Sequence, residues 1–207
     1  MKPGSLIVLN GNSSAGKSTI AGLMQAELDE PFLHTGMDHF LHRIPGSLIG
    51  PPGAGAARGW EITFTNGELA GAPRVTPLGY QIINGIYAAI AAYCRAGNSA
   101  IVDHVIYDPK TLQLATGNFA GLRVFSVGLT CELGEARRRE TGRGDRAPGG
   151  AAAFHELVHL YATYDFSLDV THLPAAEAAH RIVSAYLERP GGTAFGASGS
   201  GAAGGSR

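Results

Sequence analysis

The sequence predicts an α/β fold in which helices cover both faces of a parallel β-sheet. Short, continuously apolar segments alternate along the chain with segments of helical spacing, and this alternation is typical of buried parallel strands. A glycine-rich loop follows the first apolar segment and precedes the first helical one. The chain has 207 residues, of which 44% are hydrophobic, and this suits one domain with a full core.

Five apolar runs predict the strands of the sheet. They are short and almost continuously hydrophobic, as expected for strands covered on both faces. They comprise residues 5–10, 31–36, 99–103, 123–130 and 167–172. Ligands of parallel sheets bind at the carboxyl ends of the strands. The glycine-rich loop, Asp38 and Asp103 all follow predicted strand ends, so we expect them at one ligand-binding edge.

Apolar residues at helical spacing predict the helices between these strands. The predicted helices cover residues 17–28, 78–93, 132–141, 152–164 and 175–187. Gly97 is expected to stop the second helix from extending further. With the strands, these helices complete the expected alternation of the two element types.

Two stretches lack regular hydrophobic spacing. Residues 42–77 are rich in Gly and Pro and predict an excursion over the surface, because connections of this length are usually functional or mobile. Residues 190–207 are rich in Gly, Ala and Ser and predict a disordered tail. The expected organisation is therefore one domain over residues 1–189, followed by this tail.

The composition argues against several classes of protein. The formal net charge of −1 favours neither a nucleic-acid-binding surface nor a membrane-surface protein. No apolar run reaches membrane length, and the N-terminus lacks signal-peptide architecture, so we expect a cytoplasmic location. Cys94 and Cys131 have no metal-ligand spacing, and we interpret them as small core residues rather than a disulfide. The oligomeric state has no signature in the sequence.

Residues Gly11 to Ser18 match the P-loop pattern Gly-x-x-x-x-Gly-Lys-Ser. The glycines let backbone N–H groups point at phosphate oxygens, and the following helix adds the positive end of its dipole. Lys17 is expected to reach the β- and γ-phosphates and Ser18 to ligate Mg²⁺, so the motif predicts ATP and Mg²⁺ as cofactors. The predicted nucleotide-binding residues of the loop are Gly11, Asn12, Ser13, Ser14, Ala15, Gly16, Lys17, Ser18 and Thr19.

Further motifs resemble the chloramphenicol phosphotransferase family. They are Asn10–Ser18, Gly36–Asp38, Ile101–Asp103, Arg139–Arg146, and Val158-His159 with Tyr164-Asp165. The matches keep the family's order over most of residues 5–172. The resemblance implies a P-loop kinase fold of the adenylate- and shikimate-kinase type, with a mobile arginine-bearing lid. It also implies transfer of the γ-phosphoryl group of ATP to a hydroxyl of a small antibiotic, first of all chloramphenicol.

The resemblance also implies roles for individual residues. Asp38 matches the general base, which must lie within hydrogen-bond reach of the acceptor hydroxyl; a helix N-cap is the alternative. Asp103 would hold Mg²⁺ together with Ser18, or be a solvated strand-end residue. His104 stands where the family often has a second acidic residue, which leaves a second metal contact open. The resemblance also implies lid arginines that clamp the transferring phosphoryl group, namely Arg139, Arg143 and Arg146. Of these, Arg143 is expected to be catalytic together with Lys17.

A second motif competes with this interpretation. Residues 155–159 read His-Glu-Leu-Val-His, the zinc-hydrolase pattern, and on the predicted helix both histidines point away from the core. The kinase-like motifs include Val158-His159, so we favour the kinase and interpret His159 as a surface residue or a contact to substrate or lid. Trp60 and Phe64 are candidates for lining an acceptor pocket or for anchoring local packing.

Other functions stay open beside the antibiotic kinase. The acceptor could be a metabolite or a nucleoside antibiotic, because residues 42–77 match the family least. A non-catalytic protein that binds nucleotide and sequesters a drug is also conceivable, although pure binding needs no base such as Asp38. A guanine-specific switch is disfavoured, since the motifs Asn-Lys-x-Asp and Asp-x-x-Gly are missing from the sequence.

Overall fold

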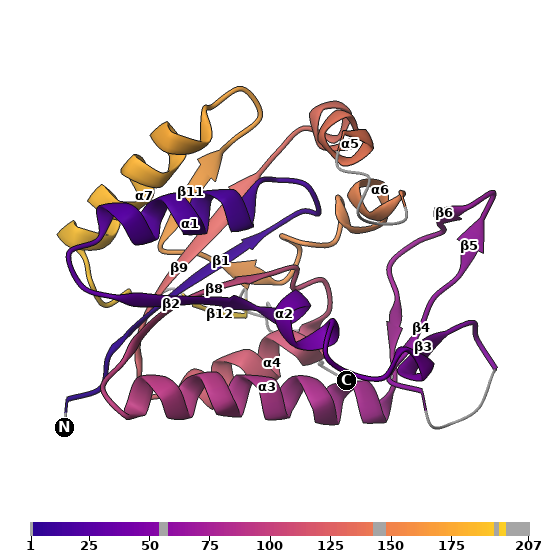
Figure 1. The fold of residues 1–207 in the computed structure, drawn as a ribbon, viewed down its shortest axis with the longest axis horizontal. Coiled ribbons are helices and arrows are strands. Elements are labelled where there is room, and N and C mark those ends of the chain that lie inside the picture. Colours follow the sequence, from indigo (N-terminus) through magenta and orange to yellow (C-terminus); the bar gives the residue numbers. More distant parts are fainter. Residues whose placement is uncertain (1, 54–57, 143–147, 193–194, 198–207) are drawn as a thin grey trace, which may run out of the picture.

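The computed structural model describes residues 2–53, 58–142, 148–192 and 195–197 (Figure 1). Its centre is a five-stranded sheet in the order β11-β9-β1-β8-β2, in which every pair of neighbours is parallel. The strands are β1 (Ser5–Gly11), β2 (Phe32–Gly36), β8 (Ser99–His104), β9 (Arg123–Thr130) and β11 (Phe166–Asp169). The parallel sheet predicted from the sequence is thereby confirmed.

Strand β1 lies in the middle of the sheet, and all seven of its residues are buried. Its side chains alternate between two cores, as the twofold period of a strand requires. Ile7 and Leu9 belong to the core on one face, whereas Leu6 and Val8 belong to the core on the other. Because β1 is central, the loop that follows Gly11 emerges in the middle of the carboxyl edge.

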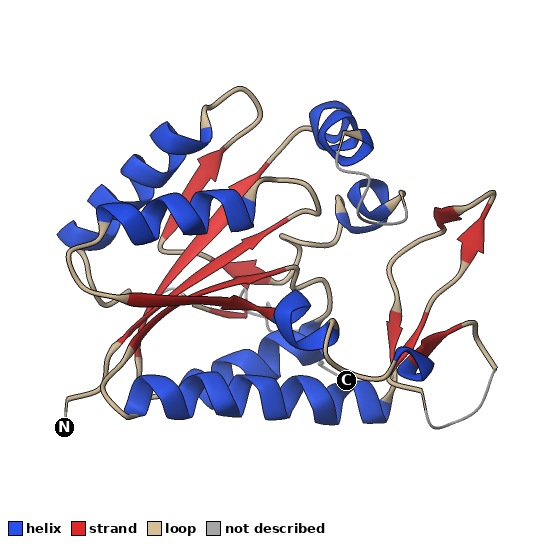
Figure 2. Ribbon diagram, in the orientation of Figure 1, coloured by secondary structure: helices blue, strands red, loops and turns tan. Residues whose placement is uncertain are grey.

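Helices cover both faces of the sheet (Figure 2). On one face lie α1 (Lys17–Glu27) and α7 (Ala175–Glu188), and on the other α3 (Pro77–Arg95) and α4 (Pro109–Phe119). Two shorter helices, α5 (Leu133–Thr141) and α6 (Gly150–Phe154), follow β9 near the carboxyl edge. Across the described ranges, every helix is too short or too polar to span a membrane.

Residues 37–76 form an excursion between β2 and α3, where the sequence predicted one over residues 42–77. It contains α2 (Met37–Leu41) and the 3₁₀ helix η1 (Gly46–Leu48). A small sheet in the order β3-β4-β7 follows, made of Ile49–Gly50, Trp60–Glu61 and Arg74–Val75. Strands β5 (Phe64–Thr65) and β6 (Glu68–Leu69) form a hairpin, whose two turn residues have positive φ, as in a type I′ turn.

Thr76 anchors the excursion to the main domain. Its backbone N–H donates to the Gly59 carbonyl at 3.0 Å, and its hydroxyl contacts the carbonyls of Arg58 and Gly59. The same hydroxyl caps α3 by accepting from the Gly79 N–H at 3.2 Å. The first turn of α3 and the chain leading into β4 are therefore held by one side chain.

Three α-helices differ from the sequence prediction, the first being α2, which no predicted helix covers. Helix α4 was not predicted, although Asp108 caps it and Pro109 occupies its first turn. The helix expected over residues 152–164 ends at Phe154. Beyond it the Val158 carbonyl accepts from the Asn10 side chain at 2.8 Å instead of continuing the helix, and residues 162–163 form β10.

Part of the segment expected to be a disordered tail packs on the domain. Gly196–Ala197 forms β12, antiparallel to β10. The Phe195 ring lies 6.3 Å from the ring of Phe119, which supplies the apolar contact that a disordered segment lacks. Residues 193–194 and 198–207 lie outside the described residues.

Candidate active site

The P-loop runs from the end of β1 into the first turn of α1. Gly16 precedes the helix with a φ of 87°, a conformation that favours glycine. A side chain at Gly11 would meet the Leu129 carbonyl oxygen at 2.7 Å, so this position also requires glycine. The Lys17 Nζ donates to the carbonyls of Gly11 at 2.9 Å and Asn12 at 2.8 Å. The amino group therefore lies over the loop that the sequence predicted to hold phosphates.

Ser18 and Asp103 meet at the carboxyl edge, as the sequence predicted. The Ser18 hydroxyl donates to Asp103 Oδ2 at 2.6 Å, and His34 Nε2 lies 3.2 Å from the same oxygen. Burial alone would raise the pKa of Asp103, but the hydrogen bonds of His34 and Ser18 and the charge of Lys17 lower it to about 2. Asp103 is therefore ionised at neutral pH and is a buried rather than a solvated strand-end residue.

These two oxygen donors fit a magnesium ion. Mg²⁺ prefers hard oxygen ligands and is usually held by one or two protein groups together with phosphates and water. No cluster of three or more His, Cys, Asp or Glu residues able to hold a metal occurs within the described ranges. A hydroxyl beside an ionised carboxylate therefore suits a nucleotide-bound ion better than a cation enclosed by protein ligands alone.

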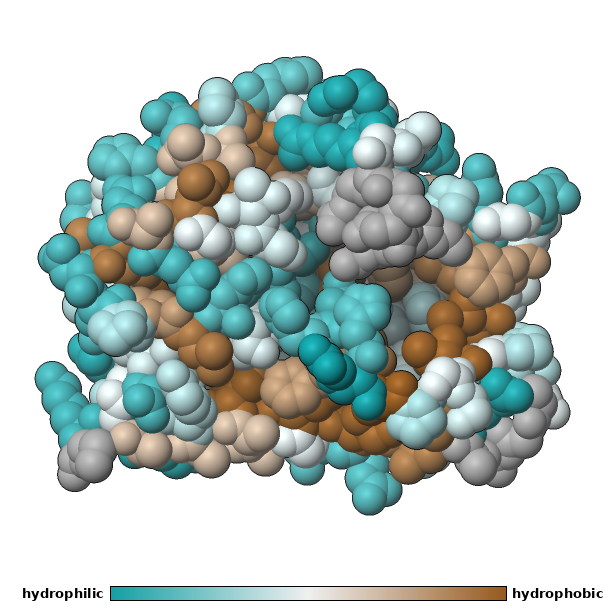
Figure 3. Space-filling model, viewed as in Figure 1, coloured by the Kyte–Doolittle hydropathy of each residue, from teal (hydrophilic) through white to brown (hydrophobic). Residues whose placement is uncertain are grey.

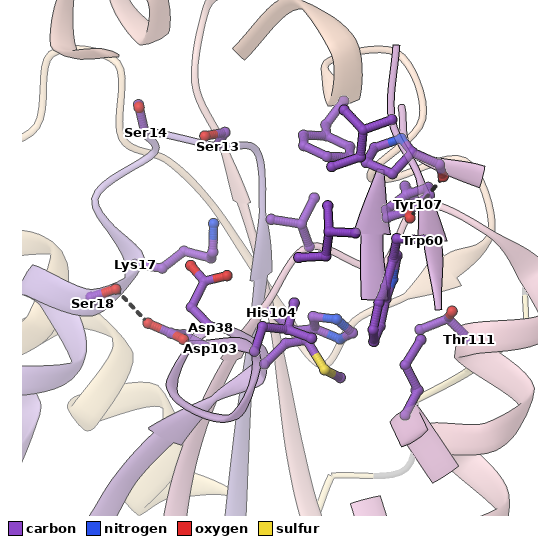
Figure 4. Close-up of a pocket in the computed structure, with 18 of the residues that line it drawn as sticks. Ser13, Ser14, Lys17, Ser18, Asp38, Trp60, Asp103, His104, Tyr107 and Thr111 are labelled. Atoms are coloured by element: carbon purple, nitrogen blue, oxygen red, sulfur yellow. Dashed lines mark hydrogen bonds between the residues drawn. The ribbon is translucent and has the colours of Figure 1, made fainter. Parts of the chain in front are cut away.

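Asp38 lies in the first turn of α2, directly after the end of β2. The N-cap of this helix is Gly36 and involves no side-chain hydrogen bond, so the alternative that Asp38 caps a helix is wrong. Figure 4 shows the Asp38 carboxylate beside the Lys17 amino group, both pointing into one cavity. The two strand ends thus bring a carboxylate and a cation to the same space.

The cavity has a volume of about 190 Å³ and lies between the P-loop and the excursion. Its P-loop side is polar, and its opposite walls are largely apolar, including Met37, Leu41, Ile49, Trp60, Ile62, Ile83, Val105 and Phe154. Apolar surface also gathers along α3 and toward β3 and β4 on the outside of the molecule (Figure 3). Among the described residues that line the cavity, Lys17 is the only Lys or Arg.

The structure separates the two aromatic residues that the sequence proposed for the pocket. Trp60 is 6% exposed and forms one wall of the cavity. Phe64 is 53% exposed in the hairpin and is not part of the lining. Sequence reasoning missed Tyr107, whose hydroxyl donates to the Pro73 carbonyl at 3.0 Å and whose ring lies 5.0 Å from that of Phe154.

Sequence reasoning also missed a buried polar pair behind the cavity. The Tyr87 hydroxyl lies 2.6 Å from His104 Nδ1, and His104 lines the cavity next to Asp103. Burial lowers the pKa of His104 to about 4, against the opposing influence of the Asp38 charge, so the ring is neutral at pH 7. A signal existed, because Tyr87 falls on the apolar face of the predicted helix and a buried hydroxyl requires a partner.

The two histidines of the zinc-hydrolase pattern do not share a helical face. They follow the end of α6, in a segment of turns. His159 Nδ1 lies 2.9 Å from the Tyr164 hydroxyl, and Nε2 lies 3.2 Å from the Leu129 carbonyl. The Asn10 amide donates to the same Tyr164 hydroxyl at 2.7 Å. His159 is therefore a partly exposed structural link behind the P-loop, and both of its ring nitrogens have partners, so neither is available to a zinc ion.

Of the three predicted lid arginines, Arg143 and Arg146 lie outside the described residues. Arg139 donates to the carbonyls of Val170 and Thr171 at 2.8 and 2.9 Å, and an added Cβ on Gly16 would lie 4.0 Å from its guanidinium. Arg139 thus lies near the P-loop, and its side chain is held by these backbone carbonyls and by an ion pair with Glu135 at 2.7 Å. Its nucleotide-binding role stays a prediction.

Glu140, which sequence reasoning missed, connects the end of α5 to the start of α6. Its carboxylate accepts from the backbone N–H of Gly149 at 3.0 Å and of Ala151 at 2.9 Å. A carboxylate at the first turn of a helix pairs otherwise unsatisfied N–H groups. The contact fixes the start of α6, next to the P-loop residue Asn12, whose amide donates to Ala151.

Together, the parallel sheet, the P-loop after its central strand and the carboxylates at neighbouring strand ends define a phosphotransferase of the P-loop kinase type. Solved structures share this fold. A sugar kinase from Janibacter aligns with a TM-score of 0.63 and 19% identity, over 91% of this chain and 97% of its own. The Mycobacterium tuberculosis APS kinase, solved in complex with AMPPNP and APS, aligns with a TM-score of 0.58 and 16% identity, over 91% and 99%.

The chain belongs to the chloramphenicol phosphotransferase-like family, whose family model matches residues 4–187. Two Mycobacterium tuberculosis proteins, from strains CDC 1551 / Oshkosh and H37Rv, are provisionally named O-phosphotransferases. Each is 34% identical to this chain over 200 residues, which cover 94% of this chain and 88% of the relative. The family resemblance deduced from the sequence motifs is thereby confirmed.

Proposed function

We propose that this protein transfers the γ-phosphoryl group of ATP to a hydroxyl of a small, uncharged molecule with an apolar or aromatic body. Chloramphenicol or a related antibiotic is the leading acceptor. The observation that carries the proposal is the cavity itself, in which Lys17 and Asp38 face apolar walls that include Trp60.

The nucleotide side of the cavity supports ATP as the phosphoryl donor. The P-loop offers backbone N–H groups, and Lys17 stands where the β- and γ-phosphates would lie. Ser18 and the ionised Asp103 would hold Mg²⁺ or its water ligands. When bound, the ion supplies neutralisation of the charge on the phosphate oxygens. Arg139 is already paired with Glu135 at 2.7 Å, so further positive charge would come mainly, by family resemblance, from Arg143 and Arg146.

Asp38 is the proposed general base. The acceptor oxygen would form a bond to the γ-phosphorus while the bond from phosphorus to the leaving oxygen of ADP breaks, and the hydroxyl proton would pass to the Asp38 carboxylate. Phosphoryl transfer depends strongly on positioning. The walls formed by α2, β4 and β8 would supply that positioning by enclosing the acceptor on several sides.

The charge of the cavity favours a neutral acceptor. Two carboxylates, Asp38 and Asp103, border the space, and Lys17 is the sole Lys or Arg in the described part of the lining. Within the described lining, an anionic metabolite would face these two carboxylates and the single cation of Lys17, which is unfavourable in a partly buried site. Apolar and aromatic walls instead bind uncharged aromatic molecules well, as expected for chloramphenicol.

An acceptor screen tests this proposal. The protein is incubated with ATP and Mg²⁺ and with chloramphenicol, tunicamycin or neutral sugars, and each acceptor is examined by mass spectrometry for one added phosphoryl group. Diacetylated chloramphenicol, whose hydroxyls are blocked, and the Lys17→Ala variant are the controls. We expect a phosphorylated product with chloramphenicol and none with either control.

Two results would contradict it. Binding of an acceptor without any product would favour a drug-sequestering protein. A phosphorylated product formed only from a sugar or nucleoside would show that the acceptor belongs to a different chemical class from chloramphenicol.

A further inference from the structure

The pair formed by Tyr87 and His104 is a buried polar contact on the acceptor side of the cavity. Tyr87 lies on α3, is 1% exposed and packs its ring against Phe119 at 5.3 Å. His104 ends β8, is 8% exposed and lines the cavity. Hydrogen bonding to Tyr87 therefore holds one edge of the imidazole inside the core.

Hydrogen-bond requirements determine which ring nitrogen carries the proton. Within the described residues, the Tyr87 hydroxyl has His104 Nδ1 as its hydrogen-bond partner. If Nδ1 carried the proton, it would donate to the Tyr87 oxygen, and the buried O–H of Tyr87 would have no acceptor, at a cost of about 1–3 kcal/mol. Buried hydroxyls are almost always paired. Tyr87 therefore donates to Nδ1, and the neutral ring carries its proton on Nε2.

The Nε2–H group is the edge of the ring that remains for a ligand. It has no hydrogen-bond partner in the portion of the chain that the structure describes. Figure 4 shows the His104 ring in the cavity wall between Asp38 and Trp60. A side chain that is more than nine-tenths buried and presents an unpaired donor to a cavity is suited to bind a ligand atom there.

We propose that His104 Nε2–H donates a hydrogen bond to a neutral oxygen of the acceptor, and that this bond orients the acceptor hydroxyl toward Asp38 and Lys17. The oxygen would be a carbonyl, nitro, ether or second hydroxyl oxygen. Asp38 and Asp103 lie on the same side of the cavity and disfavour a carboxylate in that place. This inference rests on the proposed phosphotransfer and adds a specificity-determining residue to it.

Steady-state kinetics with chloramphenicol as the probe test this role. In His104→Asn the amide lies near the position of Nδ1, keeps the contact to Tyr87 and cannot reach the acceptor. We expect its KM for chloramphenicol to rise about threefold to tenfold, as for one neutral hydrogen bond, with an unchanged KM for ATP. His104→Gln places an amide nitrogen near Nε2 and is expected to restore most of the affinity.

Two hydroxyl deletions on α3 form a matched pair. Tyr87→Phe keeps the ring packing, but without the hydroxyl nothing fixes the tautomer of His104. The KM for chloramphenicol is therefore expected to rise, by a smaller factor than in His104→Asn. Tyr93→Phe removes a hydroxyl from an exposed position of the same helix and is expected to change nothing. Thermal unfolding of each variant verifies that it is folded.

An NMR measurement tests the tautomer without any acceptor. The measurement is a long-range ¹H–¹⁵N correlation spectrum of the imidazole rings in the ¹⁵N-labelled protein. The His104 signals are identified as those that disappear in His104→Asn and shift in Tyr87→Phe. They are expected to show the pattern of the Nε2–H tautomer. An Nδ1–H form would overturn the inference. So would an unchanged chloramphenicol KM in a folded, active His104→Asn.

A lower kcat with an unchanged KM would also overturn it and would make His104 a positioning residue for Asp38. Absence of transfer by the wild-type protein to every acceptor would instead refute the proposed phosphotransfer, and the acceptor role of His104 with it. The tautomer would still be decided by the NMR spectrum.

Discussion

The two carboxylates of the cavity have different surroundings, although both follow strand ends. Asp103 accepts hydrogen bonds from Ser18 and His34, so its charge is fixed and its orientation is set. Asp38 stands on the short helix α2 and points into the cavity beside Lys17. Carboxylates in different environments can take different roles within one site. This contrast supports Asp103 as a metal-side residue and Asp38 as the base.

The first prediction concerns the base. In Asp38→Asn the side chain keeps its shape but cannot take up a proton at neutral pH, so the transfer rate is expected to fall by about 10²–10⁴-fold. ATP binding is expected to persist, because the P-loop belongs to a different strand end. Comparison of kcat and its pH profile in the two proteins checks this, and the acidic limb of the wild-type profile is expected to disappear. A near-normal kcat with an unchanged profile would leave Asp38 without a catalytic role.

The second prediction concerns the pH dependence of stability. The pKa of Asp103 is about 2 in the folded protein and 3.8 as a reference value. A lowered pKa stabilises the fold above the unfolded value, and this stabilisation is lost as the pH falls toward the folded value. Between about pH 5 and pH 2, the free energy of unfolding is therefore expected to fall by about 2 kcal/mol more in the wild type than in Asp103→Asn. Urea unfolding across this range measures the difference, and parallel curves would contradict the assignment.

At the scale of elements, the first turn of α3 holds the wall of the acceptor cavity. Gly79 lies so close to Gly59 that an added Cβ would stand 2.1 Å from the Gly59 carbonyl oxygen, and Thr76 bonds to the same carbonyl. Gly59 directly precedes Trp60, the aromatic wall of β4. The close packing of α3 against Gly59 therefore fixes the chain directly before Trp60 in the cavity wall.

The third prediction uses two glycines of this helix. Gly79→Ala is expected to displace β4, to cost about 1–3 kcal/mol of stability through overpacking and to raise the KM for the acceptor. Gly85→Ala is the matched control, since nothing lies within 4 Å of an added Cβ there. It is expected to stabilise the protein by about 0.5–1 kcal/mol, the helix propensity gained over glycine. Urea unfolding and acceptor kinetics compare the two variants, and equal effects would refute the proposed close contact.

At the scale of the whole molecule, the P-loop sits where the layers of the fold meet. It follows the central strand β1 and leads into α1, which covers one face of the sheet. Through Asn12 it also contacts Ala151 of α6. On the other face, α3 and the excursion form the acceptor side. A nucleotide bound at the loop would therefore contact several elements that the folded state holds together and the unfolded chain does not.

The fourth prediction follows from this arrangement. At a concentration about 100 times its dissociation constant, a ligand of the folded state adds about 2.7 kcal/mol of stability, or about 5–11 °C in Tm for a chain of this size. AMPPNP with Mg²⁺ is expected to raise the Tm by this amount in the wild type and far less in Lys17→Ala. Differential scanning fluorimetry measures both. An equal increase in the two proteins would place the nucleotide away from the P-loop.

Sequence patterns located the strands well because their signals are local. The run from Arg123 to Thr130 was predicted with the bounds that β9 has, since its six buried central residues are mostly apolar. The end of α6 could not be predicted, because Asn10, distant in the sequence, takes the Val158 carbonyl. Strand β12 in the C-terminal segment was not predicted either, because it forms only by pairing with β10. Helix α4 was missed despite a local signal, the pair Asp108-Pro109.

The sequence alone determined the fold class, the P-loop, the two strand-end carboxylates and the family, because each depends on residues close together in the chain. The tertiary structure decided how these parts meet. It paired Ser18 with Asp103 across 85 positions, removed the capping role of Asp38, and placed Trp60 but not Phe64 in the cavity wall. It also revealed the contact between Tyr87 and His104. Contacts between different elements depend on the packing of the layers, which no local pattern of residues encodes.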